Sequence, residues 1–412
     1  MFLGIIISIL LSYYQSQTLA FLQPLHHLAN VPKSVKRKSH VNRFLLNNVK
    51  WDEANFIEHK LNNDVRTHAT RRNVLQSIGV FSFFMNPSIS NGQETNIQAQ
   101  SITMPLESTG NSYLIYYRVS QSLFRAVLDT GSPFLMLPNS CSENTRAKAG
   151  CYREQGVPSG LSNTIELFDG FEGEVEWRKG EFSFYNATGS MMVSSPKFIF
   201  GVANDDILSG TGGLFFGLIK NTDKRIRPSF LGQTEVTSFI VDLRKDEVRN
   251  ISPSLTLSTV PYLTNRLTNR DYIPITNYLR KCGDPVQHYV SKLKSIFING
   301  QQLIPRDKRP IYAIIDTGTT GMVVSKELYD QRYIEARERR ERKLWGGEVE
   351  LTFETEMKNT KSIKAVKPLT TPFDPKPNWK KFKGHVIVVG LSFLEDQQIT
   401  IDIDDRRLWF EQ

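Results

Sequence analysis

The sequence predicts a mostly-β protein built of two β lobes. From residue 101 onward, short runs rich in β-branched and aromatic residues, such as SYLIYYRV, SFIVDL and QITIDID, alternate with turn residues, which is typical of strands. Helical periodicity is scarce and is clearest over 325–343, where Ser325 is the expected N-cap. An apolar run that ends in Asp-Thr-Gly occurs at Asp129 and again at Asp316, about half of the mature chain apart. This repeated pattern indicates an internal duplication of one lobe.

Length, charge and cysteine content exclude several classes of protein. A chain of 412 residues is long enough for two or three lobes with their own cores. The formal net charge is +9, but residues 1–100 hold much of the surplus, so the rest lacks the basic surface of a nucleic-acid-binding protein. Three cysteines are too few for a disulfide scaffold. The histidines show no metal-ligand spacing, so we expect no metal and no other cofactor.

The first hundred residues have the composition of a targeting leader. Residues 1–20 contain a short apolar core and end in Thr-Leu-Ala, as a cleavable secretory signal peptide does. Residues 21–50 are basic and contain no acidic residue, which is typical of a transit peptide, and Arg71-Arg72 precede a mildly apolar stretch as in a twin-arginine signal. In this order the segments resemble a bipartite or tripartite plastid leader, and they predict a plastid location that could be the thylakoid lumen.

The alternative interpretation of the leader is a secreted or vacuolar protein. In that case residues 21–100 are a basic prosegment rather than a transit and twin-arginine-like signal. A membrane anchor fits less well, because the apolar run within 1–20 is too short to span a bilayer comfortably. We therefore expect no stable membrane span in the mature chain.

The residues around the two aspartates suit a pair of cooperating carboxyl groups. A glycine two residues after each aspartate lets backbone N–H groups approach the carboxylate, and the hydroxyl of Ser132 or Thr319 can donate a hydrogen bond to it. If each lobe contributes one aspartate, two carboxyls about 3 Å apart cannot both ionise, so they share one proton. One carboxyl then acts as a base and the other as an acid, a combination that activates water against a peptide carbonyl without a metal.

Further motifs flank the two Asp-Thr-Gly sequences. Phe215-Phe216-Gly217 and Val388-Val389-Gly390 each place two apolar residues before a glycine, and HYVSKLKSIFINGQQLIP precedes the second Asp-Thr-Gly. With these motifs the chain resembles the pepsin-type aspartic proteases, and most closely the plant nepenthesin-like group. The resemblance implies a bilobal fold with the active site in the cleft between an N-terminal lobe, 101–237, and a C-terminal lobe, 238–412. It also implies that each apolar-apolar-Gly segment threads behind a catalytic loop.

The resemblance also assigns roles to individual residues. It implies that Asp129 and Asp316 are the catalytic pair. The residues expected to support the pair in its two loops are Thr130, Gly131, Ser132, Thr317, Gly318 and Thr319. It favours a short disulfide loop between Cys141 and Cys151, for which the sequence alone leaves two free thiols as the alternative.

The sequence departs from the family at the flap, the hairpin that covers the cleft. The family carries a tyrosine there, whereas this chain has none between residues 152 and 185. Phe168 or Phe171 takes its approximate place, and Gly173 is the expected hairpin turn. Met136 stands where the family has the tryptophan that bonds this tyrosine. Because both partners are missing together, we expect a repacked apolar contact.

These features predict an acid-favouring aspartic endopeptidase that acts as a monomer. Its expected substrates are extended polypeptides with apolar residues flanking the cut, because strands of a β lobe can pair with a substrate backbone. The alternative is a catalytically weak or inactive binding or inhibitor protein on the same fold, as some plant relatives are. Both Asp-Thr-Gly motifs are intact, which favours the enzyme.

Overall fold

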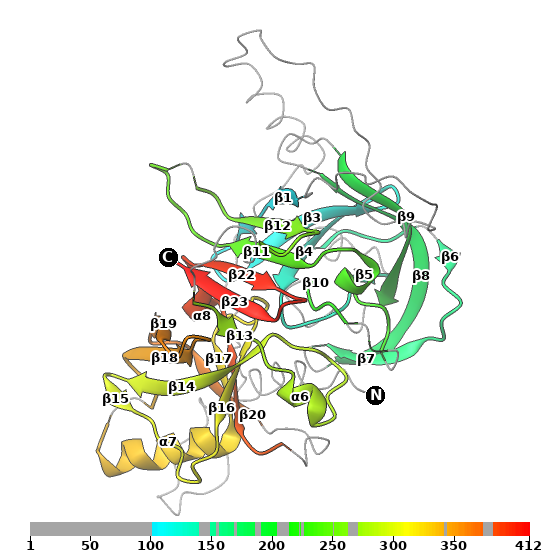
Figure 1. Ribbon diagram of the computed structural model, residues 1–412. Coiled ribbons are helices and arrows are strands. Elements are labelled where there is room, and N and C mark those ends of the chain that lie inside the picture. Colours follow the sequence, from blue (N-terminus) through cyan, green and yellow to red (C-terminus); the bar gives the residue numbers. More distant parts are fainter. Residues whose placement is uncertain are drawn as a thin grey trace, which may run out of the picture. The chain divides into compact units, whose positions relative to one another are not determined.

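The computed structural model describes residues 101–412 except for several short segments. The predicted signal peptide, 1–20, and the leader, 21–100, lie outside the described residues. Within the described part, the chain is mostly β, as predicted, and its strands form three sheets (Figure 1). The segments not described are 140–148, 154–155, 169–170, 186–190, 204–213, 222, 224–225, 250, 263–270, 342–343 and 374–381.

The strand that carries the first aspartate belongs to a nine-stranded sheet. Buried and half-buried side chains alternate along β3, the period of two that its sequence predicts. The long strands β8 and β9 pair antiparallel and lie side by side in Figure 1. The sheet contains β2 (Glu107–Ser108), β3 (Tyr113–Val119), β4 (Ser122–Asp129), β5 (Met136–Pro138), β6 (Val157–Pro158), β7 (Thr164–Phe168), β8 (Phe171–Tyr185), β9 (Met191–Ala203) and β10 (Leu214–Gly217).

Aromatic side chains in the core hold β10 beside β4 in this sheet. The rings of Phe216 and Phe230 lie 4.5 Å apart between centroids, and Tyr117 lies 5.2 Å from Phe216. All three side chains are fully buried, and burying each aromatic ring contributes about 1.5–3 kcal/mol to stability. β10 pairs parallel with β4, so this packing also sets the position of the strand that ends in Asp129.

The strand that leads to the second aspartate belongs to an eight-stranded sheet. Four of the five residues of β16 are buried, because the strand lies between β14 and β21 in the sheet. The sheet contains β14 (Val290–Ile298), β15 (Gln301–Gln302), β16 (Ile311–Ile315), β17 (Met322–Ser325), β18 (Glu348–Glu354), β19 (Thr360–Val366), β20 (Thr370–Phe373) and β21 (His385–Val389).

The third sheet, of six strands, joins segments from distant parts of the chain. The first described strand, β1, pairs with β12, and β11 pairs with β22 near the C-terminus (Figure 1). The boundary predicted between the lobes, at residue 237, directly precedes β11 and stays a prediction. The sheet contains β1 (Ser101–Pro105), β11 (Ser238–Asp242), β12 (Ser254–Ser258), β13 (Ile273–Pro274), β22 (Gln398–Asp402) and β23 (Arg407–Glu411).

Helices are few and short in the described part of the chain. The predicted helix over 325–343 is observed as α7 (Lys326–Glu338), with Ser325 at its N-cap position. The Ser325 side chain forms no capping hydrogen bond, because its hydroxyl lies instead 3.4 Å from Nδ1 of His385. The other helices are η1 (Leu231–Gln233), α6 (Tyr278–Lys281) and α8 (Leu391–Leu394).

Candidate active site

The two aspartates lie at the ends of two strands with matching surroundings. Asp129 is the last residue of β4, and Asp316 directly follows β16. β10 runs parallel to β4 with Gly217 opposite Asp129, and β21 runs parallel to β16. The Leu218 N–H donates to the Asp129 carbonyl at 2.8 Å, and the Asp316 N–H donates to the Val389 carbonyl at 3.0 Å. Both apolar-apolar-Gly segments therefore lie behind the aspartate loops, as the resemblance implies.

Two buried threonines fasten the two loops to each other. The Thr130 N–H donates to Oγ1 of Thr317 at 3.1 Å, and the Thr317 N–H donates to Oγ1 of Thr130 at 3.0 Å. Each hydroxyl then donates onward to a carbonyl of the opposite strand, Thr130 to Ile315 at 2.9 Å and Thr317 to Leu128 at 2.7 Å. Each such bond contributes about 0.5–1.5 kcal/mol. The threonines thus support the site by joining its two halves.

The glycines of the two loops permit the close approach of the two carboxyl groups. A Cβ atom built on Gly131 would lie 2.5 Å from Cγ of Asp316, and one built on Gly318 would lie 2.6 Å from Cγ of Asp129. Each glycine therefore faces the aspartate of the other half. No other residue type fits either position, because any side chain would push the opposite carboxyl group away.

The hydrogen bonds to the two carboxyl groups are not equivalent. The Gly131 N–H donates to Asp129 at 2.7 Å, and the Gly318 N–H donates to Asp316 at 2.9 Å. Thr319 adds a second bond to Asp316, from its hydroxyl at 2.9 Å. Ser132, the equivalent residue of the first loop, makes no hydrogen bond of normal length and angle among the described residues. The sequence predicted matching supports. In the structure the Ser132 hydroxyl acts on Asp129 but in poorer geometry than the bond of Thr319 to Asp316.

The environment of Asp129 favours its protonated form. Asp129 and Asp316 are 2% and 1% exposed. Burial, the negative charge of Asp316 and a hydrogen bond between the two carboxyl groups hold the pKa of Asp129 well above its usual range. The nearby hydroxyl of Ser132 and the N–H of Gly131 act in the opposite direction without offsetting this rise. The pair therefore retains a proton at pH values where an exposed aspartate has lost its own.

A hairpin occupies the region where the sequence predicts the flap. β7 and β8 pair antiparallel, with Phe168 opposite Phe171 (Figure 1). The prediction that Gly173 forms the turn is wrong, because Gly173 lies inside β8 and pairs with Glu166. The intervening Asp-Gly sequence is the stronger turn signal, and its residues, 169–170, lie outside the described residues. A flap role for Phe168 and Phe171 stays a prediction.

Trp177 anchors this hairpin to the segment that follows the first aspartate loop. It lies on β8, is 2% exposed, and donates from Nε1 to the hydroxyl of Thr164 on β7 at 2.9 Å. Its ring meets that of Phe134 edge to face at 5.3 Å. Met136 belongs to the same buried cluster. Met136 thus packs in a cluster that includes the Trp177 indole of the hairpin, and the expected contact with Phe168 or Phe171 stays a prediction.

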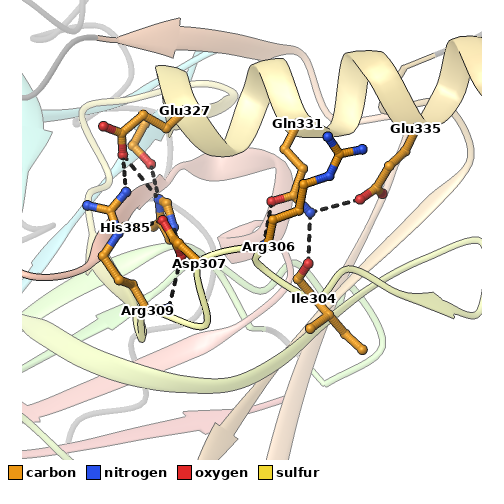
Figure 2. Close-up of polar contacts among 9 residues, drawn as sticks. Ile304, Arg306, Asp307, Arg309, Glu327, Gln331, Glu335 and His385 are labelled. Atoms are coloured by element: carbon orange, nitrogen blue, oxygen red, sulfur yellow. Dashed lines mark hydrogen bonds and ion pairs between the residues drawn. The ribbon is translucent and has the colours of Figure 1, made fainter.

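Away from the aspartates, three side chains could surround a cation. Ligand atoms of Asp307, Glu327 and His385 lie within 4.8 Å of one another (Figure 2). The sequence gave no sign of this group, because its members are distant in the chain. Arg309 donates to both carboxylates and offsets part of their charge. Although partial burial raises it, hydrogen bonds from the Arg309 N–H and from His385 bring the pKa of Asp307 down to about 2. We therefore assign no metal to this group.

Two other predictions concern residues outside the site. Cys151 is buried and disulfide-bonded, and Cys282 is a buried cysteine in its thiol form; Cys141, the predicted partner of Cys151, lies outside the described residues. No helix in the described part of the chain is both long and apolar enough to cross a membrane.

Comparisons with known proteins identify the fold but no closer relative. No protein-family model matches the chain, and no curated protein matches it. Among solved structures, 383 chains match, and one of them is the crystal structure of basic 7S globulin from soybean, with a TM-score of 0.51. The similarity covers 76% of this chain and 95% of the globulin at 13% sequence identity. At this identity the likeness concerns the fold alone, and the fold is the bilobal pepsin-like one.

Proposed function

We propose that the chain is an aspartic endopeptidase that hydrolyses peptide bonds with a water activated between Asp129 and Asp316. The observation that carries this proposal is the mutual fit of the two loops. Each glycine faces the opposite carboxyl group, and the threonines lock the loops in that position. Burying two carboxyl groups against each other costs free energy unless they share a proton. Two strand ends without a catalytic role would not require such a pair.

The different environments of the two aspartates suggest a division of roles. Asp316 accepts two hydrogen bonds, from Gly318 and Thr319, which orient its carboxylate oxygens, and we assign it the role of the base. Asp129, with its raised pKa, is the acid. Asp316 takes a proton from water as the oxygen attacks the peptide carbonyl carbon, and Asp129 gives its proton to the carbonyl oxygen. Asp316 then gives its new proton to the nitrogen while Asp129 takes a proton back from a hydroxyl of the tetrahedral intermediate. The carbon–nitrogen bond breaks, the amine and the carboxylic acid leave, and the pair again holds one proton.

The proposed substrates are extended polypeptides with apolar residues on both sides of the cut. Strand edges of a β lobe can bind such a chain through its backbone. The proposal includes membership of the nepenthesin-like group and action as a monomer, for which the sequence motifs are the support. Acid conditions favour activity, because the reaction needs one proton on the pair.

The test compares the purified chain with Asp129→Asn, a variant of nearly identical shape, on a library of peptides from pH 3 to 8. Asp330→Asn is the matched control, because Asp330 is an exposed carboxylate on α7. We expect cleavage by wild type and by Asp330→Asn, and a loss of at least about 10³-fold in Asp129→Asn, since the acid is removed. Equal cleavage by all three proteins would show that a contaminating protease is responsible.

The second candidate function is a catalytically weak or inactive binding or inhibitor protein. Two observations favour it: the unsatisfied hydroxyl of Ser132 and the absence of a tyrosine from residues 153–184. The fold is compatible with either function, since a soybean globulin shares it. A folded wild-type protein that cleaves no peptide between pH 3 and 8 would favour this candidate.

We also propose that residues 1–100 direct the protein to a plastid, and within it to the thylakoid lumen, on the composition of the leader. A fluorescent protein fused behind residues 1–100 tests this. Fluorescence in the secretory pathway or in vacuoles would instead support the basic prosegment.

A further inference from the structure

Tyr289 connects the backbones of the two aspartate strands from behind the pair. Its side-chain hydroxyl donates to the Leu218 carbonyl at 2.7 Å. Its own backbone carbonyl accepts a hydrogen bond from the Ile315 N–H at 3.1 Å. Leu218 is in turn bonded to the Asp129 carbonyl at 2.8 Å, and Ile315 directly precedes Asp316. Tyr289 thus lies one hydrogen bond from the strand that leads to Asp316 and two hydrogen bonds from Asp129.

We propose that Tyr289 is a positioning residue that fixes the separation of the two catalytic aspartates. This inference rests on the proposed function and names a part of the same site. The reciprocal bonds of Thr130 and Thr317 join the two loops beside the carboxyl groups. The contact through Tyr289 joins the segments behind these loops, so it restrains the pair from a second direction.

The surroundings of Tyr289 keep it in this position. The residue is 3% exposed, and its ring meets Phe239 of β11 edge to face at 5.5 Å. Burial raises the pKa of its hydroxyl, so the group stays protonated and able to donate. The hydroxyl also accepts a longer bond, of 3.4 Å, from the Lys220 N–H. The hydroxyl therefore acts as both donor and acceptor, and its partners, Leu218 and Lys220, belong to the segment that follows β10.

The catalytic rate should depend on the contact through Tyr289, because it depends on the separation of the two carboxyl groups. Proton sharing requires the carboxyl groups to stay in contact, and catalytic geometry must hold to within about 0.5 Å. A displacement of about 1 Å can reduce a rate by about 10²-fold. The hydroxyl bond is one of several contacts that join the two halves, so its loss should produce a part of that effect.

The test substitutes Tyr289→Phe, which removes only the hydroxyl. Tyr117→Phe is the matched control, because Tyr117 is fully buried in the first sheet and its hydroxyl has no hydrogen-bond partner among the described residues. We expect kcat of Tyr289→Phe to fall about tenfold with KM unchanged. The alkaline limb of its pH profile should move to lower pH, because a looser pair releases its proton more easily. Tyr117→Phe should keep both values.

A measurement that needs no activity separates this inference from the proposed function. The buried, shared proton makes unfolding depend on pH, and that dependence should extend over a narrower pH range in Tyr289→Phe than in Tyr117→Phe. If the wild type cleaves no peptide but the pH range over which unfolding depends on pH is narrower in Tyr289→Phe, the endopeptidase proposal fails and the positioning role stands. If the two variants behave alike in kcat, in the alkaline limb and in the pH dependence of unfolding, the positioning role is overturned.

Discussion

Replacing Asp129 with asparagine should stabilise the protein, and increasingly so as the pH rises from 4 towards neutrality. The carboxyl group of Asp129 is buried against Asp316, and its pKa in the folded protein lies well above the ordinary value of 3.8. An amide of the same size cannot ionise and can donate to the Asp316 carboxylate. Asp129→Asn therefore removes the cost of burying a second charge while preserving the shape of the site.

The sign and size of the effect follow from proton linkage. Between pH 3.8 and the raised pKa, the folded protein keeps a proton on Asp129 that the unfolded chain has lost. The stability contributed by this proton is present in full below pH 3.8 and is lost as the pH rises through the folded-state pKa. For one proton the loss is at most about 1.4 kcal/mol per pH unit. The advantage of Asp129→Asn should grow at that rate and then level off.

Urea unfolding at each pH unit from 4 to 8 measures this difference directly. The control is Asp330→Asn, in which the same chemical change is made at an exposed carboxylate that pairs with Lys326 at 2.6 Å. Its difference from wild type should vary little with pH, since surface pairs contribute about 0–1 kcal/mol. A stability difference between Asp129→Asn and wild type that stays constant over this range would refute the idea of a shared proton.

Two further substitutions test the geometry of the loops. Gly131→Ala should lower kcat/KM by about 10²-fold, because its Cβ would displace the Asp316 carboxyl group by roughly 1 Å. The control is Gly180→Ala, whose Cβ would lie 3.2 Å from the Phe200 ring and 3.3 Å from the Ser120 hydroxyl, away from both aspartates, and it should lower kcat/KM much less. Thr319→Val should weaken activity about tenfold or more and move the acidic limb of the pH profile to higher pH, since a bond to an ionised carboxylate contributes about 1.5–3 kcal/mol. Ser132→Ala should change the activity and the acidic limb much less. Equal effects of Ser132→Ala and Thr319→Val in steady-state assays would contradict the proposed difference between the two aspartates.

The sequence predicted the central pair because its information is local and repeated. Each aspartate comes with its own glycine, hydroxyl residue and preceding strand, and the pattern appears twice. The same locality explains the strand prediction, since alternation within β3 is visible without knowledge of its neighbours. The error at Gly173 has a related cause. A glycine near the middle of a hairpin sequence suggests a turn, but the actual register depends on which residues of β7 and β8 pair.

Contacts between distant segments could not be predicted in this way. Tyr289 meets Leu218, 71 residues earlier, and nothing in either segment specifies the other. His385 likewise meets Asp307 across 78 residues and looked isolated in the sequence. The anchoring of Trp177 on Phe134 depends on two sheet segments whose packing is set by the core as a whole. Such contacts are products of the complete fold.

The two carboxyl groups do not have identical surroundings, although the motif around them is duplicated. A shared proton makes one carboxyl group an acid and the other a base even in identical halves, so the surroundings only bias which group has which role. One difference lies at the third residue after each aspartate. Thr319 donates to Asp316 at 2.9 Å, whereas the Ser132 hydroxyl acts on Asp129 without a bond of normal length and angle. The side chains at these two positions, one branched at Cβ and one not, therefore distinguish the nearly symmetric halves.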